Sequence, residues 1–272
     1  MPELPEVETI RLGLEPWLVG KEVINVEILD PRSLRRHELG DFTEFLTGKT
    51  IKAINRKGKY LWLTFSNEDI VLVMHLGMSG QLLIKDPKES LEKHAKVLLT
   101  LANGKQLRFV DQRIFGGMFL DNSDNKVPAS TAHIALDPLD KLFVPPVQKA
   151  REIKRLLLDQ TWVSGIGNIY ADESLWRAKL HYRTKATEIP KQQYELLWKS
   201  VKDVLNEAIV AGGTSFDKLY VNTNGESGYF SRSLNVYGRV GETCPRCGNV
   251  IVREKFMNRS SFLCLHCLSA MR

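Results

Sequence analysis

The sequence predicts an α+β protein of two domains, a strand-rich N-terminal domain behind one leading helix and a helical C-terminal domain. Three observations support this class. Alternating or continuous apolar runs of strand length recur over the first half, and apolar residues recur at helical spacing over the second half. A proline-rich segment separates the two halves. A chain of 272 residues, 43% of them hydrophobic, also exceeds the size at which a single core usually stops growing.

A helix is expected to open the first domain, because Pro5 suits a first helical turn and apolar residues follow at helical spacing. These are Val7, Ile10, Leu14, Trp17 and Leu18. Strands are then expected over 60–65, 70–76, 81–84, 97–101 and 106–110. Gly77 to Gly80 supplies a turn, and Asn103-Gly104 is typical of a tight hairpin. Together these strands predict a sandwich or a barrel.

The domain boundary is expected at 136–150, where three prolines prevent regular structure and favour a stiff extended connection. Apolar repeats that predict helices begin at Ile153, Ile169 and Tyr194. The last helix should stop at Gly212-Gly213. Residues 217–240 are polar, contain glycine and have no period, which predicts a long loop, and loops of this length are commonly functional.

The net charge of +6 is unevenly distributed along the chain. Residues 1–147 hold 19 Lys and Arg against 20 Asp and Glu, whereas residues 148–272 hold 19 against 12, an excess of +7. Such an excess is typical of a surface that binds a polyanion, most commonly nucleic acid. No apolar run approaches the ~20 residues of a membrane helix, so no membrane is expected as a partner. MPELPEVETI lacks the basic and apolar regions of a secretory signal, and a cytoplasmic protein is expected.

The four cysteines form two C-x₂-C pairs, Cys244 with Cys247 and Cys264 with Cys267, separated by sixteen residues. Two such pairs supply the four thiolates that a tetrahedral Zn²⁺ ion binds. The sequence therefore predicts one structural zinc ion, because a closed four-cysteine site leaves no position for water. Disulfides are the alternative, disfavoured in a cytoplasmic protein, and His266 is a competing ligand.

The N-terminus is a candidate reactive group. Pro2 follows an initiator methionine of the kind that is usually removed before a small residue, which would leave a free secondary amine. An α-amine has a pKa of ~7.7 to 8.0 against ~10.4 for lysine, so far more of it is unprotonated at neutral pH. Its attack on an aldehyde-like sugar carbon would give a cationic iminium, and Glu3 and Glu6 could move protons beside it. The alternative is a frayed chain end without chemistry.

Short motifs run along the whole chain. They are MPELPEVETIRLGLEP at the start, GKYL at 58–61, HLGMSG at 75–80, GIGNIYADESL at 165–175, GYF at 228–230, VYGR at 236–239 and the cysteine-rich hairpin. In order and spacing they resemble the formamidopyrimidine-DNA glycosylase family. The resemblance implies a bacterial base-excision repair enzyme that acts on damaged double-stranded DNA as a monomer. This family removes oxidised purines, such as 8-oxoguanine and formamidopyrimidines, and then cleaves the abasic strand by β,δ-elimination.

The resemblance also implies how the domains of the predicted α+β protein are arranged along the chain. An N-terminal catalytic β-sandwich domain with an N-terminal helix is expected over 1–135, a linker over 136–150, a helix-two-turn-helix domain over 151–240 and a C-terminal zinc finger with four cysteine ligands over 241–272. A lesion-recognition loop is expected at 217–237, inside the helix-two-turn-helix domain.

Catalytic roles follow from the same resemblance. Pro2 matches the nucleophile that attacks C1′ of the damaged nucleotide and forms a Schiff base, and Glu3 matches the acid and base that protonates the sugar ring oxygen. Lys59, in the GKYL strand, matches a lysine that contacts a phosphate beside the lesion and assists catalysis. Arg259 on the zinc hairpin and His75 match further phosphate contacts.

Asn168 matches another phosphate contact, at a point where two glycines open a helix and backbone N–H groups face outward. A flipped nucleotide leaves a gap in the duplex, and Met78, Arg113 and Phe115 match the residues that fill it. The two apolar side chains can wedge between bases, and the guanidinium can hydrogen-bond the orphaned base. Lys154 is assigned to the pocket for the damaged base, and Glu6 joins the DNA-binding residues.

Three functions stay open at this point. They are the oxidised-purine glycosylase and lyase, an endonuclease VIII-type glycosylase for oxidised pyrimidines, and a non-catalytic zinc protein that binds DNA. The PELPEVET start favours the first over the second. The glycines usual beside Arg259 are absent from Asn258-Arg259-Ser260-Ser261, which leaves the form of the hairpin turn open. If Met1 stayed attached, the Pro2 nitrogen would be an amide and could not attack.

Overall fold

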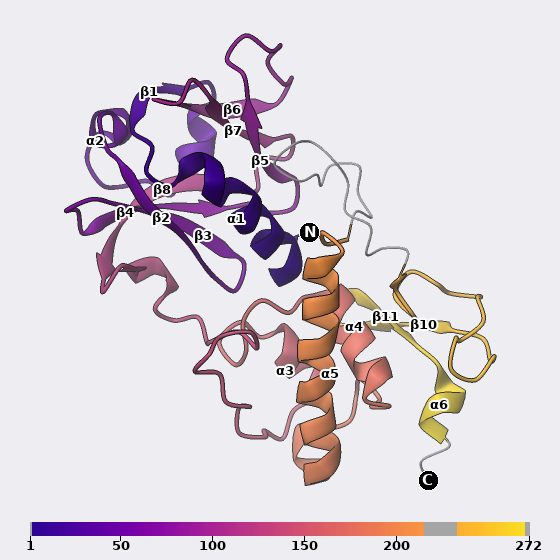
Figure 1. Cartoon of the computed structure of the whole chain (residues 1–272). Helices are drawn as coiled ribbons and strands as arrows, with labels where there is room; N and C mark the ends of the chain where they lie inside the picture. Colours follow the sequence, from indigo (N-terminus) through magenta and orange to yellow (C-terminus); the bar gives the residue numbers. More distant parts are fainter. Residues whose placement is uncertain (1, 215–232, 270–272) are drawn as a thin grey trace. The chain divides into compact units, whose positions relative to one another are not determined.

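The computed structural model describes residues 2–214 and 233–269, which form two compact units (Figure 1). Among these residues, unit 1 contains 2–133 and 211–214, and unit 2 contains 134–210 and 233–269. The GYF motif and the expected lesion-recognition loop as far as residue 232 lie outside the described residues.

Unit 1 consists of helix α1 (Leu4–Leu18) and two antiparallel sheets. The first sheet has the order β1 (Val23–Ile28), β6 (Ala95–Leu101), β7 (Gln106–Asp111) and β5 (Gly80–Lys85). The second has the order β2 (Ile51–Lys57), β3 (Tyr60–Phe65), β4 (Ile70–His75), β8 (Gly117–Asp124) and β9 (Val127–Pro128). The short helices are η1 (Pro31–Leu34), α2 (Phe42–Leu46) and η2 (Ala129–Thr131).

One core joins both sheets of unit 1 to α1. Leu63 and Leu72 of the second sheet and Leu99 and Phe109 of the first all belong to it and are fully buried. From α1, Ile10, Leu14 and Leu18 enter the same core. Burial of each such side chain stabilises the folded state by about 1.5–3 kcal/mol. These apolar positions of the sequence are therefore buried positions of the structure. The predicted N-terminal helix and β-sandwich are thus confirmed.

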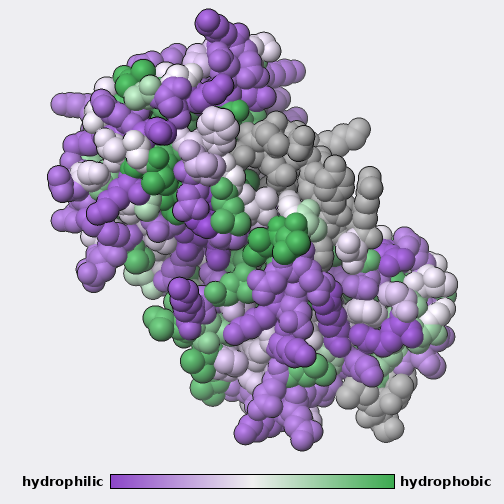
Figure 2. All heavy atoms as spheres, in the orientation of Figure 1, coloured by the Kyte–Doolittle hydropathy of each residue, from purple (hydrophilic) through white to green (hydrophobic). Residues whose placement is uncertain are grey.

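Unit 2 is helical and ends in a hairpin followed by a short helix. Its elements are α3 (Ile153–Leu158), α4 (Asn168–Arg177), η3 (Ala186–Glu188), α5 (Lys191–Val210), β10 (Val252–Phe256), β11 (Arg259–Leu263) and α6 (Leu265–Ser269). Helix α5 ends before Gly212 and Gly213, both at positive φ, as predicted. Its apolar stripe is buried, and Figure 2 shows a largely hydrophilic face over the same helix.

The segment expected as a linker at 136–150 has no regular secondary structure, yet it is fixed within unit 2. Trp162 Nε1 donates to the carbonyl of Val147 at 3.2 Å, and Tyr194 Oη donates to that of Pro146 at 2.5 Å. Gln148 Nε2 donates to the carbonyls of Ala186 and Ile189 at 2.7 and 2.9 Å. These bonds anchor the segment to unit 2, although its prolines lack the backbone N–H that a strand or a helix requires.

The β10–β11 hairpin turns through Met257 and Asn258, since Phe256 pairs with Arg259. Both turn residues have positive φ, 49° and 58°, as a type I′ turn requires. The turn therefore forms without the glycines usual in the family, and Arg259 is exposed at the first position of β11. Within the described ranges, no helix combines the length and apolar character needed to cross a membrane.

Candidate active site and metal centre

Pro2 and Glu3 lie at the N-terminal end of α1, where both are buried. Glu3 is the N-cap of the helix, and its backbone N–H donates to Glu6 Oε2 at 2.8 Å in a capping box. The positive end of the helix dipole favours the carboxylates at this position. Residues 2–6 are thus an ordered part of unit 1 and do not form a frayed chain end.

Glu6 also connects α1 to the end of the described part of unit 1. Its Oε1 accepts hydrogen bonds from the Thr214 N–H at 2.8 Å and the Thr214 hydroxyl at 3.0 Å. Gly213 lies against the same side chain at φ +81°, and a Cβ there would stand 3.1 Å from Glu6 Oε1. One buried carboxylate therefore fixes both the segment after Pro2 and the backbone that leads into the expected lesion-recognition loop.

Lys59 and His75 belong to one cationic cluster in unit 1. Lys59 is half-buried in the turn that joins β2 to β3, one residue before the strand on which it was expected. His75 ends β4, and its ring lies 4.6 Å from the Tyr60 ring. Burial, followed by the charges of Arg36 and Lys59, lowers the pKa of His75 to about 4.

His75 is therefore neutral at pH 7, and a hydrogen bond selects its tautomer. The Gly77 N–H donates to His75 Nδ1 at 3.2 Å. A nitrogen that accepts a hydrogen bond carries no proton, so the proton resides on Nε2. His75 consequently offers a neutral N–H donor beside the ammonium of Lys59.

Two loops of unit 1, residues 76–80 and 111–117, meet at a close backbone contact. A Cβ on Gly77, which has φ +60°, would stand 2.4 Å from the Gly116 nitrogen, so only glycine fits there. Fully buried Asp111 accepts from the Ser79 hydroxyl at 2.5 Å and from the Gly116 N–H at 2.8 Å. Asp111 thus holds the two loops together.

The three residues expected to fill the gap in the duplex lie on these two loops. Met78 is 39% exposed and Phe115 is 52% exposed. Arg113 is exposed, and its backbone N–H donates to Asp111 Oδ1 at 3.2 Å. The structure therefore presents two apolar groups and one guanidinium to solvent from a fixed backbone.

Asn168 is the first residue of α4 in unit 2, after Gly167 at the N-cap. Its Nδ2 donates to the Ser260 carbonyl at 2.9 Å. Its Oδ1 is buried and has no hydrogen-bond partner among the described residues. Asn168 also lies in the first turn of α4, where the positive end of the helix dipole favours an anion.

Lys154, which the resemblance assigns to the damage pocket, is fully buried in unit 2. Its Nζ donates to Asp172 Oδ1 at 2.6 Å, to Ser261 Oγ at 2.8 Å and to the Ser260 carbonyl at 3.0 Å. An ammonium has three protons, and these three acceptors match them. Lys154 is therefore engaged with α4 and β11.

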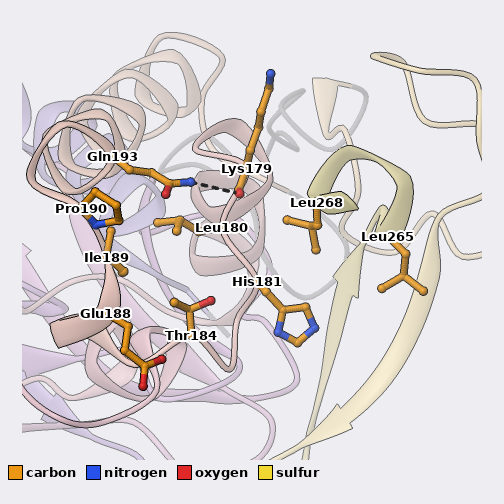
Figure 3. A pocket seen from close by; sticks show the side chains of 10 residues that line it. All are labelled: Lys179, Leu180, His181, Thr184, Glu188, Ile189, Pro190, Gln193, Leu265 and Leu268. Atoms are coloured by element: carbon orange, nitrogen blue, oxygen red, sulfur yellow. Dashed lines mark hydrogen bonds between the residues drawn. The ribbon is translucent and has the colours of Figure 1, made fainter. Parts of the chain in front are cut away.

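A pocket of about 550 Å³ in unit 2 contains none of the predicted site residues (Figure 3). Lys179, Leu180 and His181, after α4, line one part of it, and Leu265 and Leu268 of α6 line another. At the edge of this pocket, Gln193 Nε2 donates to the Lys179 carbonyl at 3.3 Å. Burial lowers the pKa of His181.

The four cysteines meet in unit 2, and their sulfur atoms all lie within 4.8 Å of one another. Cys244 and Cys267 are 3.8 Å apart at Sγ, and Cys247 and Cys264 are 3.4 Å apart. Zn–S bonds of ~2.3 Å place tetrahedral sulfurs about 3.8 Å apart, so this geometry fits zinc. All four thiols are free, which excludes the disulfide alternative, and His266 is exposed outside the cluster.

Sequence reasoning missed two buried acidic residues that organise the predicted site. One is Asp111, and the other is Glu173, whose carboxylate accepts from the backbone N–H groups of Asn235, Val236 and Tyr237 at 2.8 to 3.0 Å. Both interrupt an apolar pattern, Asp111 at the end of a buried strand and Glu173 on the buried side of a helix. A buried carboxylate requires hydrogen-bond donors, so that interruption was the available signal.

Family models match most of the chain. The formamidopyrimidine-DNA glycosylase N-terminal domain matches residues 1–118, the formamidopyrimidine-DNA glycosylase H2TH domain matches 134–219, and the zinc finger found in FPG and IleRS matches 241–270. The four cysteines fall inside the last match, so their cluster is the site of one structural zinc ion.

Similar proteins share this arrangement over their full lengths. A formamidopyrimidine-DNA glycosylase of Rhodococcus jostii (strain RHA1) is 52% identical over 284 residues, covering 100% of this chain and 97% of the relative. Two solved structures of Lactococcus lactis Fpg are each 35% identical and cover 98% of this chain and 99% of theirs. One, with DNA that contains N7-benzyl-Fapy-dG, has a TM-score of 0.88, and the other, with DNA that contains an oxidised pyrimidine, has 0.87. The chain therefore belongs to the formamidopyrimidine-DNA glycosylase family.

Proposed function

We propose that this protein is a base-excision repair enzyme that removes oxidised purines from double-stranded DNA and then cleaves the abasic strand. The observation that carries the proposal is the buried, hydrogen-bonded segment of Pro2 and Glu3 in a chain of this family. The names of the relatives and the formamidopyrimidine lesion in the Lactococcus complex support the same substrate class. The monomer is the proposed acting form, and the bacterial cytoplasm is its proposed location.

In this mechanism the Pro2 amine attacks C1′ of the damaged nucleotide, and the bond between C1′ and the base breaks. The amine gives up its proton, and the departing base, which leaves with the electron pair of that bond, takes up a proton. Glu3 protonates the ring oxygen, so the sugar opens and the new C–N bond becomes an iminium. The cation then acts as an electron sink while the 3′ and 5′ phosphates leave in successive eliminations. Positioned proton transfer of this kind contributes ~10²–10⁴-fold to a rate, and Glu3 at the N-cap is held for that role.

Four residues are proposed to bind phosphates, Lys59 and His75 in unit 1 and Asn168 and Arg259 in unit 2. Lys59 and Arg259 supply positive charge, whereas His75 supplies a neutral Nε2–H donor because its pKa is lowered to about 4. Asn168 supplies its side-chain amide, and its position in the first turn of α4 adds the positive end of the helix dipole. Contacts of this kind fix the register of the DNA but carry no sequence information, as suits an enzyme that searches for damage.

Met78, Arg113 and Phe115 are proposed to fill the gap left by the flipped nucleotide. Extrusion of a base costs a few kcal/mol of stacking and pairing, and apolar wedges recover part of it. The exposure of Met78 and Phe115 on loops fixed by Asp111 supports this role. The zinc ion, held by the four cysteines, supplies structure to the hairpin that carries Arg259.

The test is borohydride trapping with a duplex that contains 8-oxoguanine, followed by peptide mapping of the adduct. We expect a covalent adduct at the α-nitrogen of Pro2, because borohydride reduces the iminium. Absence of any adduct under conditions in which the protein binds the duplex would leave a DNA-binding protein without chemistry. An adduct on a lysine side chain would contradict Pro2 as the nucleophile.

A second candidate is a glycosylase that prefers oxidised pyrimidines. The Lactococcus complex with DNA containing an oxidised pyrimidine supports it. Single-turnover cleavage of matched duplexes containing 8-oxoguanine or thymine glycol separates the two candidates. We expect faster cutting at 8-oxoguanine, and the reverse order would favour the second candidate.

A further inference from the structure

An ion pair in unit 2 is buried to an unusual degree. Lys154 is 0% exposed and Asp172 is 2% exposed, with 2.6 Å between Nζ and Oδ1. Lys and Asp are almost never fully buried unless paired, and an apolar pair of the same size is often equally stable. Stability therefore does not by itself account for the pair.

The remaining bonds of the pair converge on β11. Lys154 Nζ donates to the Ser260 carbonyl at 3.0 Å and to Ser261 Oγ at 2.8 Å. Asp172 Oδ2 accepts from the Phe262 N–H at 3.0 Å. Three consecutive residues are thus held, and they directly follow Arg259.

Asn168 shares this anchor. Its Nδ2 donates to the same Ser260 carbonyl, at 2.9 Å, that accepts from Lys154. Ser260 is the neighbour of Arg259 in the strand, and Asn168 and Asp172 are one helical turn apart on α4. The two proposed phosphate-binding residues of unit 2 are therefore linked through one backbone group that the ion pair holds.

We propose that Lys154 and Asp172 are positioning residues that set Arg259 relative to Asn168, so that both reach phosphates of the same DNA strand. The proposal rests on the proposed function, specifically on the phosphate-binding role of Arg259. It differs from the assignment of Lys154 to the pocket for the damaged base, because a positioning role affects DNA binding even where the DNA has no damaged base.

The test uses Lys154→Met, whose unbranched side chain has a similar length. Burial raises the pKa of Asp172 to about 7, so the carboxyl left without its partner can take up a proton and become neutral. The zinc ion independently closes the base of the hairpin through the four cysteines. We therefore expect a folded variant with one zinc per chain.

The measurement is the affinity for a duplex with a tetrahydrofuran abasic analogue, by fluorescence anisotropy from about 50 to 200 mM salt. Loss of one charge-assisted contact weakens binding by about tenfold. The slope of log K against log[salt] should fall by about 0.9, the value for one phosphate. Arg259→Ala should give the same change in slope, since it removes the contact directly.

Non-additivity separates positioning from a merely structural role. If Lys154 acts through Arg259, the double variant should bind within about twofold of Arg259→Ala alone. Losses that multiply would overturn the proposal, and so would unchanged affinity in Lys154→Met. Unchanged affinity and slope in Arg259→Ala would instead show that the phosphate role of Arg259 has failed.

Lys185→Met is the matched control, since it removes one charge from an exposed ion pair with Glu188 in unit 2. Its affinity should stay within about twofold of wild type. If Lys154→Met loses zinc or fails to fold, Ser261→Ala decides, because it removes one bond of the network and no charge. We expect a loss of about threefold that disappears in the Arg259→Ala background, and a loss that persists there would overturn the proposal.

Discussion

At the residue scale, the proposed chemistry depends on carboxylates that fix backbone as well as on those that move protons. Glu6 accepts hydrogen bonds from two distant parts of unit 1, namely from the Glu3 N–H and from the backbone N–H and the hydroxyl of Thr214. It is 1% exposed, so each lost acceptor leaves a buried donor without a partner. Glu6 thus supports the backbone beside Pro2 and Glu3, and its expected role in DNA binding stays a prediction.

Glu6→Gln should lower both stability and excision. The amide nitrogen cannot accept a hydrogen bond, so at least one of the donors is left unsatisfied, at about 1–3 kcal/mol. Thermal unfolding and single-turnover excision measure the two effects. Glu15→Gln, on the same helix in a half-exposed pair with Arg11, is the control and should change stability by less than about 0.5 kcal/mol. Equal effects of the two substitutions would contradict the role given to Glu6.

His75 should remain neutral in the free protein well below pH 6.5. Its folded pKa of about 4 lies below the ordinary value of 6.5, because burial and the charges of Arg36 and Lys59 disfavour the cation. The unfolded chain binds the proton first, so stability is unaffected above pH 6.5 and falls as the pH drops from 6.5 towards 4. An NMR titration of the ring should give a midpoint of about 4.

His75→Gln supplies the comparison for that titration, since its side chain does not titrate. The dependence of unfolding free energy on pH between 6.5 and about 4 should become shallower in this variant. A ring titration with a midpoint at the ordinary value of 6.5 in the wild type would contradict the neutral-donor role.

At the element scale, the sequence predicted the helices with an apolar stripe and the apolar strands β3, β4, β6 and β7, which are buried along most of their length. The five expected strands and the helices α1, α3, α4 and α5 all form. Strands β1, β2 and β8 were not predicted. In β1, Ile24 and Ile28 are 49% and 37% exposed, and its burial does not alternate. Trp17 fits the helical repeat of α1, yet it is 42% exposed. The spacing of apolar residues identifies the apolar face of a helix or strand, but it does not show whether another element covers that face.

Pairing between distant segments was the other limit of the sequence. Asp172 and Phe262 are bonded across 90 positions, and no period in either segment indicates the partner. The turn at Asn103-Gly104 also differs from the tight hairpin that was predicted. The Leu101 N–H donates to the Lys105 carbonyl, so the loop is longer than two residues, and only Gly104 of the two has positive φ. By contrast, the sequence did predict that the two C-x₂-C pairs lie together, because one tetrahedral zinc ion requires all four thiolates.

The zinc hairpin should lose its metal and its contribution to DNA binding together. Cys247→Ser removes one thiolate from the cluster, and structural zinc contributes ~10–16 kcal/mol in small zinc domains. We expect less than one zinc per chain by elemental analysis and weaker binding of lesion DNA. His266→Ala is the control, because His266 is exposed outside the cluster. Full zinc content in Cys247→Ser would argue against this ligand set.

At the scale of the whole molecule, the proposed functions of binding and chemistry are distributed differently along the chain. Phosphate contacts are proposed in both units, and the excess of positive charge lies in residues 148–272, with 19 basic against 12 acidic residues. The nucleophile, in contrast, is a single atom at the N-terminus of unit 1. Misplacement of that atom should therefore slow the chemistry and leave most of the binding energy in place.

Pro2→Gly tests this separation. Glycine keeps an α-amine but loses the ring that fixes its direction, and a misplacement of about 1 Å costs on the order of 10²-fold in rate. Excision of 8-oxoguanine and the yield of borohydride adduct should both fall by about that factor, while affinity for the tetrahydrofuran duplex stays within about threefold because no phosphate contact changes. A variant with wild-type turnover would contradict a role of the proline ring in directing the amine, and an adduct that does not map to the α-nitrogen of Pro2 in the wild type would refute that nitrogen as the nucleophile. A variant that lost binding and turnover in equal measure would show instead that Pro2 supports the DNA-binding surface, since chemistry and affinity would then depend on the same residue.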